Sequence, residues 1–331
     1  MSGAIDVHAH VLLPALQAAV AERDPEGFAA AQALDAKRQG GASMKASGAM
    51  IGARFEQLTV LARRLSDMDA ARIDRQVVSP SPSHYYPWAS PELATWVANE
   101  ANRAVAELVA QAPERLVGLG LVPLQHPELI VAALENAMLE HKLVGVEISS
   151  FAGDVELSDA RLEPFWARAA ELGAIVFLHP FGCSLDERLD VYYLSNTVGQ
   201  PAENAVALSH LIFSGVLDRH PTLKIVAAHG GGYLPTYIGR SDHAWTVRPE
   251  AHDCANLPSS YLSRITFDSL VHTPEALRAL VLAVGADRVV LGSDFPFDMG
   301  VADPVERVEA AGFPTVEVDA ILFGNALELL A

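Results

Sequence analysis

The chain has 331 residues, half of them hydrophobic and 19% charged, which is typical of a folded globular protein with one large domain or two ordinary ones. Its formal net charge of −18 argues against nucleic acid and anionic membranes as partners, although a locally basic pocket can still take an anionic small molecule. No apolar stretch reaches the roughly 18 residues that a membrane span requires.

The cysteine content and the N-terminus both bear on the cellular compartment. The two cysteines, Cys183 and Cys254, are too few for a disulfide framework or a Cys-rich zinc site. The N-terminus runs almost at once into the first apolar segment, which leaves no room for a secretory signal. We therefore expect a cytoplasmic protein.

The first predicted strand, residues 5–10, ends in the pair His8 and His10. Successive side chains of a strand alternate between its two faces, so these two imidazoles point the same way, about 7 Å apart. Two imidazoles in this arrangement can share one metal ion. The pair alone fits an ordinary set of core or surface histidines equally well.

Seven further Val-, Ile- and Leu-rich runs follow, of the kind that form parallel strands buried on both faces. They are Arg75–Ser81, Leu116–Leu124, Val144–Ser149, Ala174–Pro180, Leu223–His229, Arg264–Ser269 and Arg288–Asp294. Helical patterns separate or follow them at Ser90–Gln111, Pro127–His141, Asp159–Leu172, Gln200–Arg219, Pro274–Val284 and Thr315–Leu330. Strand and helix alternating eight times predict a (β/α)8 TIM barrel, with an open doubly wound sheet as the alternative.

The stretch between the first strand and a helix that begins near Phe55 interrupts this alternation. Residues 12–53 are rich in Gly, Ala and Ser, so we expect this insertion to be either disordered or a functional lid. Because it follows the first strand it would lie over the active-site mouth, and we favour the lid. We predict a single barrel domain over residues 1–331 that carries this insertion.

Catalytic residues of such a barrel lie at the C-terminal ends of its strands. His8 and His10 end the first predicted strand, and the other candidates that end strands are His179, His229 and Asp294. Each of them alone has an ordinary structural explanation. Five such groups at the same end of four strands indicate a shared metal site.

Three imidazoles and one carboxylate, from His8, His10, His179 and Asp294, suit Zn²⁺ or another divalent transition ion with water in an open position. His229 is then a further ligand or a general base beside that water. A second metal in such barrels commonly needs a modified lysine on the fourth strand, and that strand contains no lysine. We therefore expect one metal ion per chain.

Four motifs carry a resemblance to a known family. They are His8-x-His10, Phe177-Leu-His-Pro180, Ala228-His-Gly-Gly-Gly-Tyr-Leu-Pro235 and Gly292-Ser-Asp-Phe-Pro-Phe297. The chain resembles the amidohydrolase superfamily in these motifs, and more narrowly the branch of aminocarboxymuconate-semialdehyde decarboxylase and its relatives. The likeness extends through most of the chain, apart from the insertion.

The resemblance implies Zn²⁺ held by His8, His10, His179 and Asp294, with His229 as the acid/base residue. It also implies a nonoxidative decarboxylase that releases CO₂ from an unsaturated or aromatic carboxylic acid, with His229 and Asp294 as its catalytic residues. The chemistry fits, because a metal lowers the pKa of bound water and a histidine beside it can take and return a proton. Protonating the carbon that bears the carboxylate breaks conjugation, and loss of CO₂ restores it.

The resemblance also bears on substrate binding. Arg240 matches the family arginine that binds the substrate carboxylate across a dimer interface, so we expect a homodimer. Asn196 stands where the decarboxylases carry a tryptophan, so the substrate is not expected to be aminocarboxymuconate semialdehyde itself. A second family arginine aligns nearer Gly52 than Arg54.

Several other residues near strand ends are candidates for supporting roles. Trp88, with its neighbours His84, Tyr85 and Tyr86, either lines the substrate pocket or packs on the surface. The missing side chains of Gly230–Gly232 are expected to leave space for the substrate. Asp268 and His272 are candidates to support the ligands. His210 is expected to be a core histidine or another residue that supports the ligands, and not a ligand itself.

Two other classes of function remain open from the sequence. A hydrolase or hydratase acting on a lactone, an amide or an unsaturated acid would use the same metal-bound water as a nucleophile. A non-catalytic scaffold stabilised by metal is the second class, and the presence of His229 beside the ligands argues against it.

Overall fold

The computed structural model describes residues 3–331, and each of the eight predicted strands is present in it. The strands are β1 (Ile5–Val11), β2 (Arg75–Pro80), β3 (Leu116–Gly118) with β4 (Gly120–Leu121), β5 (Gly145–Ile148), β8 (Ile175–Leu178), β9 (Lys224–Ala227), β10 (Ile265–Asp268) and β11 (Val289–Val290). All neighbouring pairs among them are parallel. The third predicted strand is divided at Leu119 into β3 and β4.

The strands close into a barrel, which confirms the predicted fold and excludes the open sheet. One set runs β1-β2-β3 and the other runs β11-β10-β9-β8-β5-β4, and β3 continues into β4 at the junction between them. At the opposite junction the amide of Val7 donates to the carbonyl oxygen of Leu291 at 2.8 Å. The amide of Asp294 donates to the carbonyl oxygen of His8, also at 2.8 Å. These bonds join the first strand to the last.

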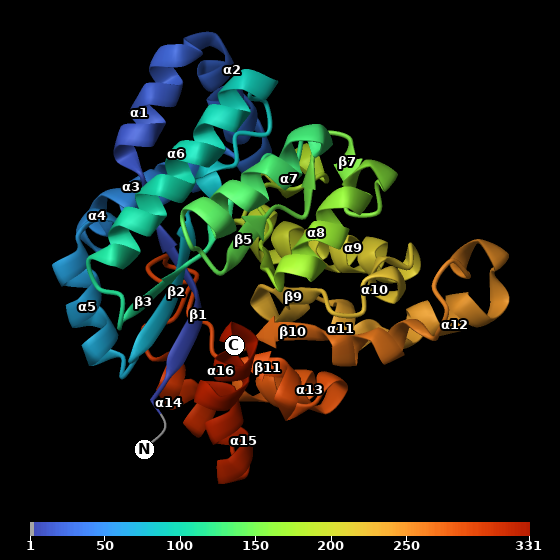
Figure 1. Cartoon of the computed structure of the whole chain (residues 1–331). Coiled ribbons are helices and arrows are strands. Elements are labelled where there is room, and N and C mark those ends of the chain that lie inside the picture. Colours follow the sequence, from blue (N-terminus) through green and yellow to red (C-terminus); the bar gives the residue numbers. More distant parts are fainter. Residues whose placement is uncertain (1–2) are drawn as a thin grey trace.

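Helices cover the outside of the barrel at the predicted positions and also at Pro304–Glu309, where none was predicted (Figure 1). They include α6 (Pro91–Ala110), α7 (Pro127–Glu135), α8 (Glu163–Leu172), α9 (Gln200–Phe213), α10 (Val216–Arg219), α13 (Pro274–Val284), α14 (Pro304–Glu309), α15 (Thr315–Asp319) and α16 (Asn325–Leu330). Ser90 caps α6, since its side chain accepts a hydrogen bond from the amide of Leu93. The helix predicted over Gln200–Arg219 is interrupted by Gly215, whose φ of 71° is left-handed.

The insertion is helical, which excludes the alternative of a disordered segment. It forms α1 (Pro14–Arg23), α2 (Pro25–Gln39) and α3 (Gly41–Ala53), and α4 (Phe55–Thr59) and α5 (Leu61–Ala70) follow. Its alanines are strong helix formers, and the side chain of Asp24 caps α2 by accepting from the amide of Gly27 at 2.9 Å. Figure 1 shows α1 and α2 at the end of the barrel opposite the N-terminus.

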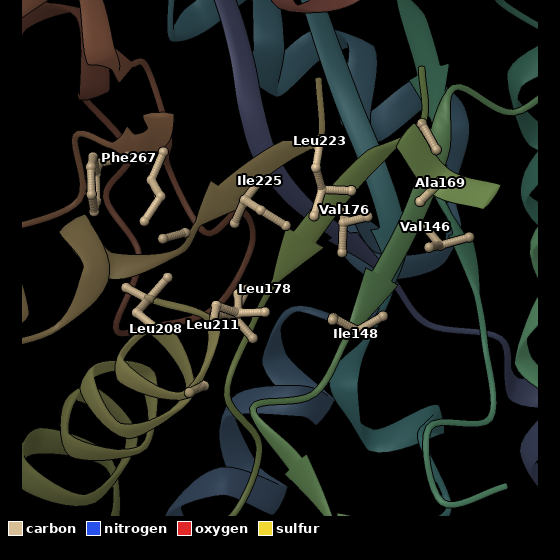
Figure 2. Close-up of a cluster of buried hydrophobic side chains, with 14 of the residues drawn as sticks. Val146, Ile148, Ala169, Val176, Leu178, Leu208, Leu211, Leu223, Ile225 and Phe267 are labelled. Atoms are coloured by element: carbon tan, nitrogen blue, oxygen red, sulfur yellow. The ribbon is translucent and has the colours of Figure 1, made fainter. Parts of the chain in front are cut away.

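Two hydrophobic layers hold the barrel together. Figure 2 shows part of the outer layer, where Leu178 of β8 lies beside Leu211 of α9 and Val176 lies beside Ile225 of β9. The inner layer fills the barrel and includes Phe177, the residue between Val176 and Leu178 in β8. This alternation is what a parallel strand covered on both sides requires.

A β-bulge in β1 changes which of its residues face the interior. The register against β2 advances by three residues in β1, from Asp6 to Ala9, while β2 advances by two. As a result Val7 packs in the inner layer, whereas Ala9 packs in the outer one. Bulges of this kind re-aim side chains, and here the bulge directs His8 and His10 into the mouth of the barrel.

The sequence predicts neither a membrane span nor a disulfide framework. Among residues 3–331 no helix is both long enough and apolar enough to cross a bilayer. Cys183 and Cys254 are both buried and are not joined in a disulfide.

Candidate metal centre

The structure brings together the five predicted site residues at one end of the barrel. One ligand atom each from His8, His179, His229 and Asp294 lie within 4.8 Å of one another. His10 adjoins them, since its Nε2 atom lies 3.2 Å from Nε2 of His8 and 3.3 Å from Oδ1 of Asp294. These groups come from β1 and from the segments just after β8, β9 and β11, so barrel closure assembles the site.

The side chains fit a divalent cation on two counts. Both ring nitrogens of His179 are buried without a hydrogen-bond partner among the described residues, and so is Oδ1 of Asp294. Buried polar atoms are ordinarily paired, so donor atoms left open and aimed at one point are suited to a metal ion. The donor set of imidazole nitrogens and one carboxylate also matches that of a catalytic zinc or related site.

Electrostatics hold His179 and Asp294 in the forms that bind a cation and draw a positive charge to His8. Burial, together with the neighbouring rings of His10 and His229, lowers the pKa of His179 well below its usual value. Burial opposes ionisation of Asp294, but the histidines around it outweigh this and hold its pKa well below the usual range. For His8, burial is outweighed by the carboxylates of Asp294 and Asp268, which raise its pKa to about 10. The site therefore favours a positive charge, carried by a proton or by a metal ion.

Asp268, at the end of β10, orients His8. Its Oδ2 atom accepts a hydrogen bond from Nδ1 of His8 at 2.6 Å, which turns Nε2 toward Asp294. Its other oxygen accepts from the backbone amides of Gly230 and Leu270, at 2.8 Å and 3.1 Å. A carboxylate behind a ligating histidine sets both its tautomer and its direction.

His10 has a different support, which the sequence analysis missed. The hydroxyl of Ser79 lies 3.2 Å from Nδ1 of His10, and Oε2 of Glu147 lies 3.6 Å from the same atom. Tyr85 donates to the other oxygen of Glu147 at 2.5 Å. Glu147 lies on the fourth barrel strand, between Val146 and Ile148, which both pack in the outer layer. Because side chains alternate along a strand, this position was the signal that Glu147 points into the barrel.

A buried polar network lies behind β1 and was also missed. Asp6 accepts from the side chain of Gln76 at 2.8 Å and from the hydroxyl of Ser293 at 2.6 Å. Gln76 in turn accepts from the guanidinium of Arg64 at 2.6 Å. The network ties α5, β2 and the segment after β11 to the strand that carries the two histidines. The only feature of the sequence that indicates this network is the presence of charged residues within apolar patterns.

The backbone at His229 corrects one expectation. His229 has a φ of 54°, and Gly230, Gly231 and Gly232 follow it with φ of 59°, 71° and 65°. Added Cβ atoms on the glycines would lie 2.5 Å from Val271, 2.7 Å from Phe267 and 2.0 Å from the carbonyl oxygen of Pro201. The glycines are required by this turn and its close packing, and they do not open space for a substrate.

Left-handed backbone marks both His229 and Asp294, whose φ values are 54° and 56°. Such a conformation in a non-glycine residue costs about 1–3 kcal/mol and is retained where the surroundings enforce it, often at functional sites. Oδ2 of Asp294 lies 3.5 Å from Nε2 of His229. The two strained residues therefore face each other.

The segment after β8 contributes a residue that the sequence analysis did not single out. Tyr193 has a left-handed φ of 59°, and its hydroxyl is bonded to Ser47 of α3. Burial, and then the nearby carboxylates of Asp298 and Asp294, raise the pKa of Tyr193. Asn196 lies one turn further along, half-buried, with its amide 3.4 Å from the side-chain oxygen of Gln200.

The arginine candidates lie in different places. Arg240 is exposed on α12 (Gly239–Val247), which projects from the barrel in Figure 1, and it has no ion pair within residues 3–331. Arg248 is paired with Glu250. Arg54 donates to the carbonyl of Pro296 at 2.7 Å, two residues past Asp294.

Trp88 lies outside the metal group, beneath α2. Its ring packs edge-on against Phe28 at 6.4 Å and Tyr86 at 5.8 Å between ring centroids. His84 is fully buried, and its Nε2 atom accepts from the amide of Leu13 at 3.0 Å. His210 lies elsewhere, with its Nδ1 atom 2.7 Å from the hydroxyl of Ser158, so it is not a ligand. Its side chain is 34% exposed, so the expectation of a core histidine is wrong.

Comparisons with known proteins agree with this geometry. Residues 5–331 match the amidohydrolase family. The 2-amino-3-carboxymuconate-6-semialdehyde decarboxylase of Dictyostelium discoideum is 37% identical over 270 residues, which cover 81% of this chain and 75% of that protein.

Two solved structures share the whole fold. The 5-carboxyvanillate decarboxylase of Sphingomonas paucimobilis has a TM-score of 0.84 and 25% identity, covering 100% of this chain and 99% of that one. The dihydroxybenzoic acid decarboxylase of Polaromonas, solved with manganese and the inhibitor 2-nitroresorcinol, has a TM-score of 0.81 and 25% identity, covering 100% and 97%. The chain belongs to the amidohydrolase family, in the branch of 2-amino-3-carboxymuconate-6-semialdehyde decarboxylase, as its motifs predict.

Proposed function

We propose that this protein is a metal-dependent, nonoxidative decarboxylase, a carbon–carbon lyase that releases CO₂ from an unsaturated or aromatic carboxylic acid. The observation that carries the proposal is the position of His229, a proton-transfer group 3.5 Å from Asp294 and beside a complete set of metal ligands. The names of the related proteins, all three of them decarboxylases, support it.

The proposed ligands are His8, His10, His179 and Asp294, with one Zn²⁺ per chain. His229 lies within the same group of ligand atoms, but we assign it to proton transfer because it is the most exposed of the histidines, with 17% of its side chain accessible. A divalent ion held there would act as an electrophile and lower the pKa of a bound water. Manganese is bound in the Polaromonas relative, so the metal test includes both ions.

The proposed reaction uses His229 to move one proton. The protonated imidazole donates to the ring carbon that bears the carboxylate, and the bond between that carbon and the carboxylate then breaks. Its electron pair returns to the conjugated system, CO₂ leaves, and the product keeps the proton. His229 then takes a new proton from solvent. Oδ2 of Asp294 lies 3.5 Å from Nε2 of His229, where it can orient the ring for this transfer.

We propose a homodimer in which Arg240 reaches the neighbouring active site and binds the substrate carboxylate. Arg240 is exposed and has no ion pair within the described chain, so its guanidinium is available to a bound acid. Large apolar side chains stand exposed near it, with Tyr237 68% and Val247 55% accessible. Exposed apolar residues gathered in this way are typical of a contact surface.

The insertion is proposed to act as a lid on the single domain of residues 1–331. Its helix α3 contacts the segment after β8 through the bond between Ser47 and Tyr193. At the start of α3, a Cβ added to Gly40 would lie 1.8 Å from the carbonyl oxygen of Asp190. Two contacts between the insertion and the same segment fit a cover over the mouth. The two unpaired, buried cysteines accord with the proposed cytoplasmic location.

The proposal is tested by product analysis on the metal-loaded protein. A panel of hydroxybenzoates, muconates and lactones is incubated separately with Zn²⁺- and Mn²⁺-loaded enzyme, and CO₂ release is measured. We expect CO₂ from at least one acid, and release that is slower by about 10²- to 10⁴-fold from the His229→Ala variant. Hydrolysis of a lactone or hydration of an unsaturated acid without CO₂ would overturn decarboxylation in favour of the alternative class.

A further inference from the structure

A large cavity lies between α2 and the barrel mouth, next to the metal group but not lined by it. Its volume is about 650 Å³, roughly four times the cavity of about 150 Å³ that holds a benzene ring. The loops after β2, β4, β5 and β8 form its floor. Six aromatic side chains line it: Phe28, Tyr85, Tyr86, Trp88, Phe151 and Phe181.

Tyr85 connects this cavity to the metal centre. Its ring lines the cavity, while its hydroxyl lies 2.5 Å from Glu147 and 3.2 Å from the backbone oxygen of His179. Glu147 supports His10, so one side chain separates the cavity from the groups that hold the ligands. The cavity and the metal group therefore occupy neighbouring parts of the same barrel mouth, where enzymes of this fold bind substrate.

The roof of the cavity is a helix with little packing of its own. The 15-residue helix α2 has no buried residue, although one of its faces turns toward the barrel. That face carries Gly27, Phe28, Ala31, Asp35 and Arg38, spaced by three or four positions, and each of them lines the cavity. Phe28 and Ala31, with open space between them and the aromatic floor, suit a bound apolar group, while Asp35 and Arg38 make part of the roof polar.

We propose that this cavity is the subsite for a second ring of the substrate, so that the preferred substrates are extended aromatic acids with two rings rather than one. This inference rests on the proposed function, because it places the carboxylate-bearing ring at the metal centre and the second ring between Trp88 and α2. The volume exceeds the need of a single ring. Aromatic walls favour a planar, unsaturated group through edge and face contacts.

The test compares one-ring and two-ring acids in binding to the full-length, Zn²⁺-loaded protein by calorimetry. The probes are 2-hydroxybenzoate and its 3-, 4- and 5-phenyl derivatives. We expect the best phenyl derivative to bind at least about tenfold more tightly, since burying a ring of this size is worth that much or more. Ala31→Phe fills the cavity from the roof and should bring the ratio close to one.

Ala33→Phe is the matched control, because Ala33 is exposed on the same helix and does not line the cavity. It should keep the wild-type ratio. If thermal melting shows that Ala31→Phe is unfolded, Ala31→Leu replaces it. Equal affinity for the two classes of acid, or a preference that survives in a folded Ala31 variant, overturns the subsite.

Release of CO₂, measured on the same samples, separates this inference from the proposed function. Preferential binding of two-ring acids that Ala31→Phe abolishes supports the subsite even if no acid releases CO₂, a result that would overturn decarboxylation alone. Release of CO₂ from one-ring acids without any two-ring preference overturns the subsite and leaves decarboxylation standing.

Discussion

Nδ1 of His8 lies 2.6 Å from Oδ2 of Asp268, and both side chains are fully buried. Asp268→Asn keeps the shape of this partner but removes its charge and its fixed role as acceptor. We expect metal affinity to fall about 10- to 100-fold, the usual effect of losing such a partner. Competition with a chelator measures it. Asp287→Asn, at an exposed position, is the control, and equal affinity in the two variants would contradict this role for Asp268.

The metal content is expected to be close to one ion per chain. His179 offers two buried, unpaired ring nitrogens, so His179→Ala removes a ligand and should leave the site largely empty. His210→Ala serves as its control, since His210 contacts Ser158 instead. Metal analysis after expression with added Zn²⁺ decides this. Two ions per chain in the wild type, or full occupancy in His179→Ala, would show that the ligand assignment is wrong.

The variant His229→Ala distinguishes the two roles open to His229, which are metal ligand and acid/base residue. If it is the acid/base residue, His229→Ala should retain its metal and its fold and lose about 10²- to 10⁴-fold in turnover, the range for a positioned proton-transfer group. Metal content and CO₂ release are measured on the same preparation. A variant without metal would make His229 a ligand, and a fully active variant would remove it from the mechanism.

Arg240→Ala should weaken substrate binding without changing metal content, because Arg240 lies on an exposed helix outside the ligand group. Arg248→Ala, which removes a nearby arginine already paired with Glu250, is the control. Calorimetric titration of each variant with the best substrate measures the difference. Similar affinities in the two variants would count against Arg240.

A mixing experiment tests whether Arg240 acts across the dimer. The metal-free His8→Ala should be inactive alone, and Arg240→Ala should have little activity at a substrate concentration too low to saturate its weakened site. A mixed dimer contains one site with both a metal and an arginine, so an equal mixture should recover about a quarter of the wild-type activity. No recovery, once exchange of subunits has been demonstrated, would rule out action in trans.

The stability of the protein should depend on pH through His84. Burial lowers the pKa of His84 to about 4, whereas the unfolded chain has the ordinary value of 6.5. Between these values the unfolded state binds more protons, so the free energy of unfolding falls as the pH falls from 7 to 5, by about 2 kcal/mol from this group. In His84→Gln, whose amide oxygen can still accept from Leu13, this part of the pH dependence should be absent. Urea unfolding at both pH values measures it, and identical pH dependence in the two proteins would contradict it.

The order of strands and helices could be predicted from the sequence because its signals are local. Apolar runs such as Val144–Ser149 are what a parallel strand covered on both faces requires, and caps such as Ser90 mark where helices begin. The convergence of His8, His179 and Asp294 could be predicted as well, because a closed parallel barrel brings the C-terminal ends of its strands to one face.

The insertion was harder to interpret, since small residues such as those of Gly41–Ala53 suit loops and helices alike. The purpose of Gly230–Gly232 was misjudged for a related reason. Whether a missing side chain leaves room for a ligand or for the protein depends on neighbours such as Val271 and Pro201, which only the folded chain supplies.

Periodicity and motifs along the chain were enough to predict the barrel, the family and the residues that meet at its mouth. How those residues are supported, and what lies beside them, is apparent only in the folded chain. His8 and Asp268 are 260 positions apart, and the cavity beneath α2 is formed by an insertion and four separate loops. Buried polar partners and cavities depend on which surfaces meet after folding, and no local pattern specifies that meeting.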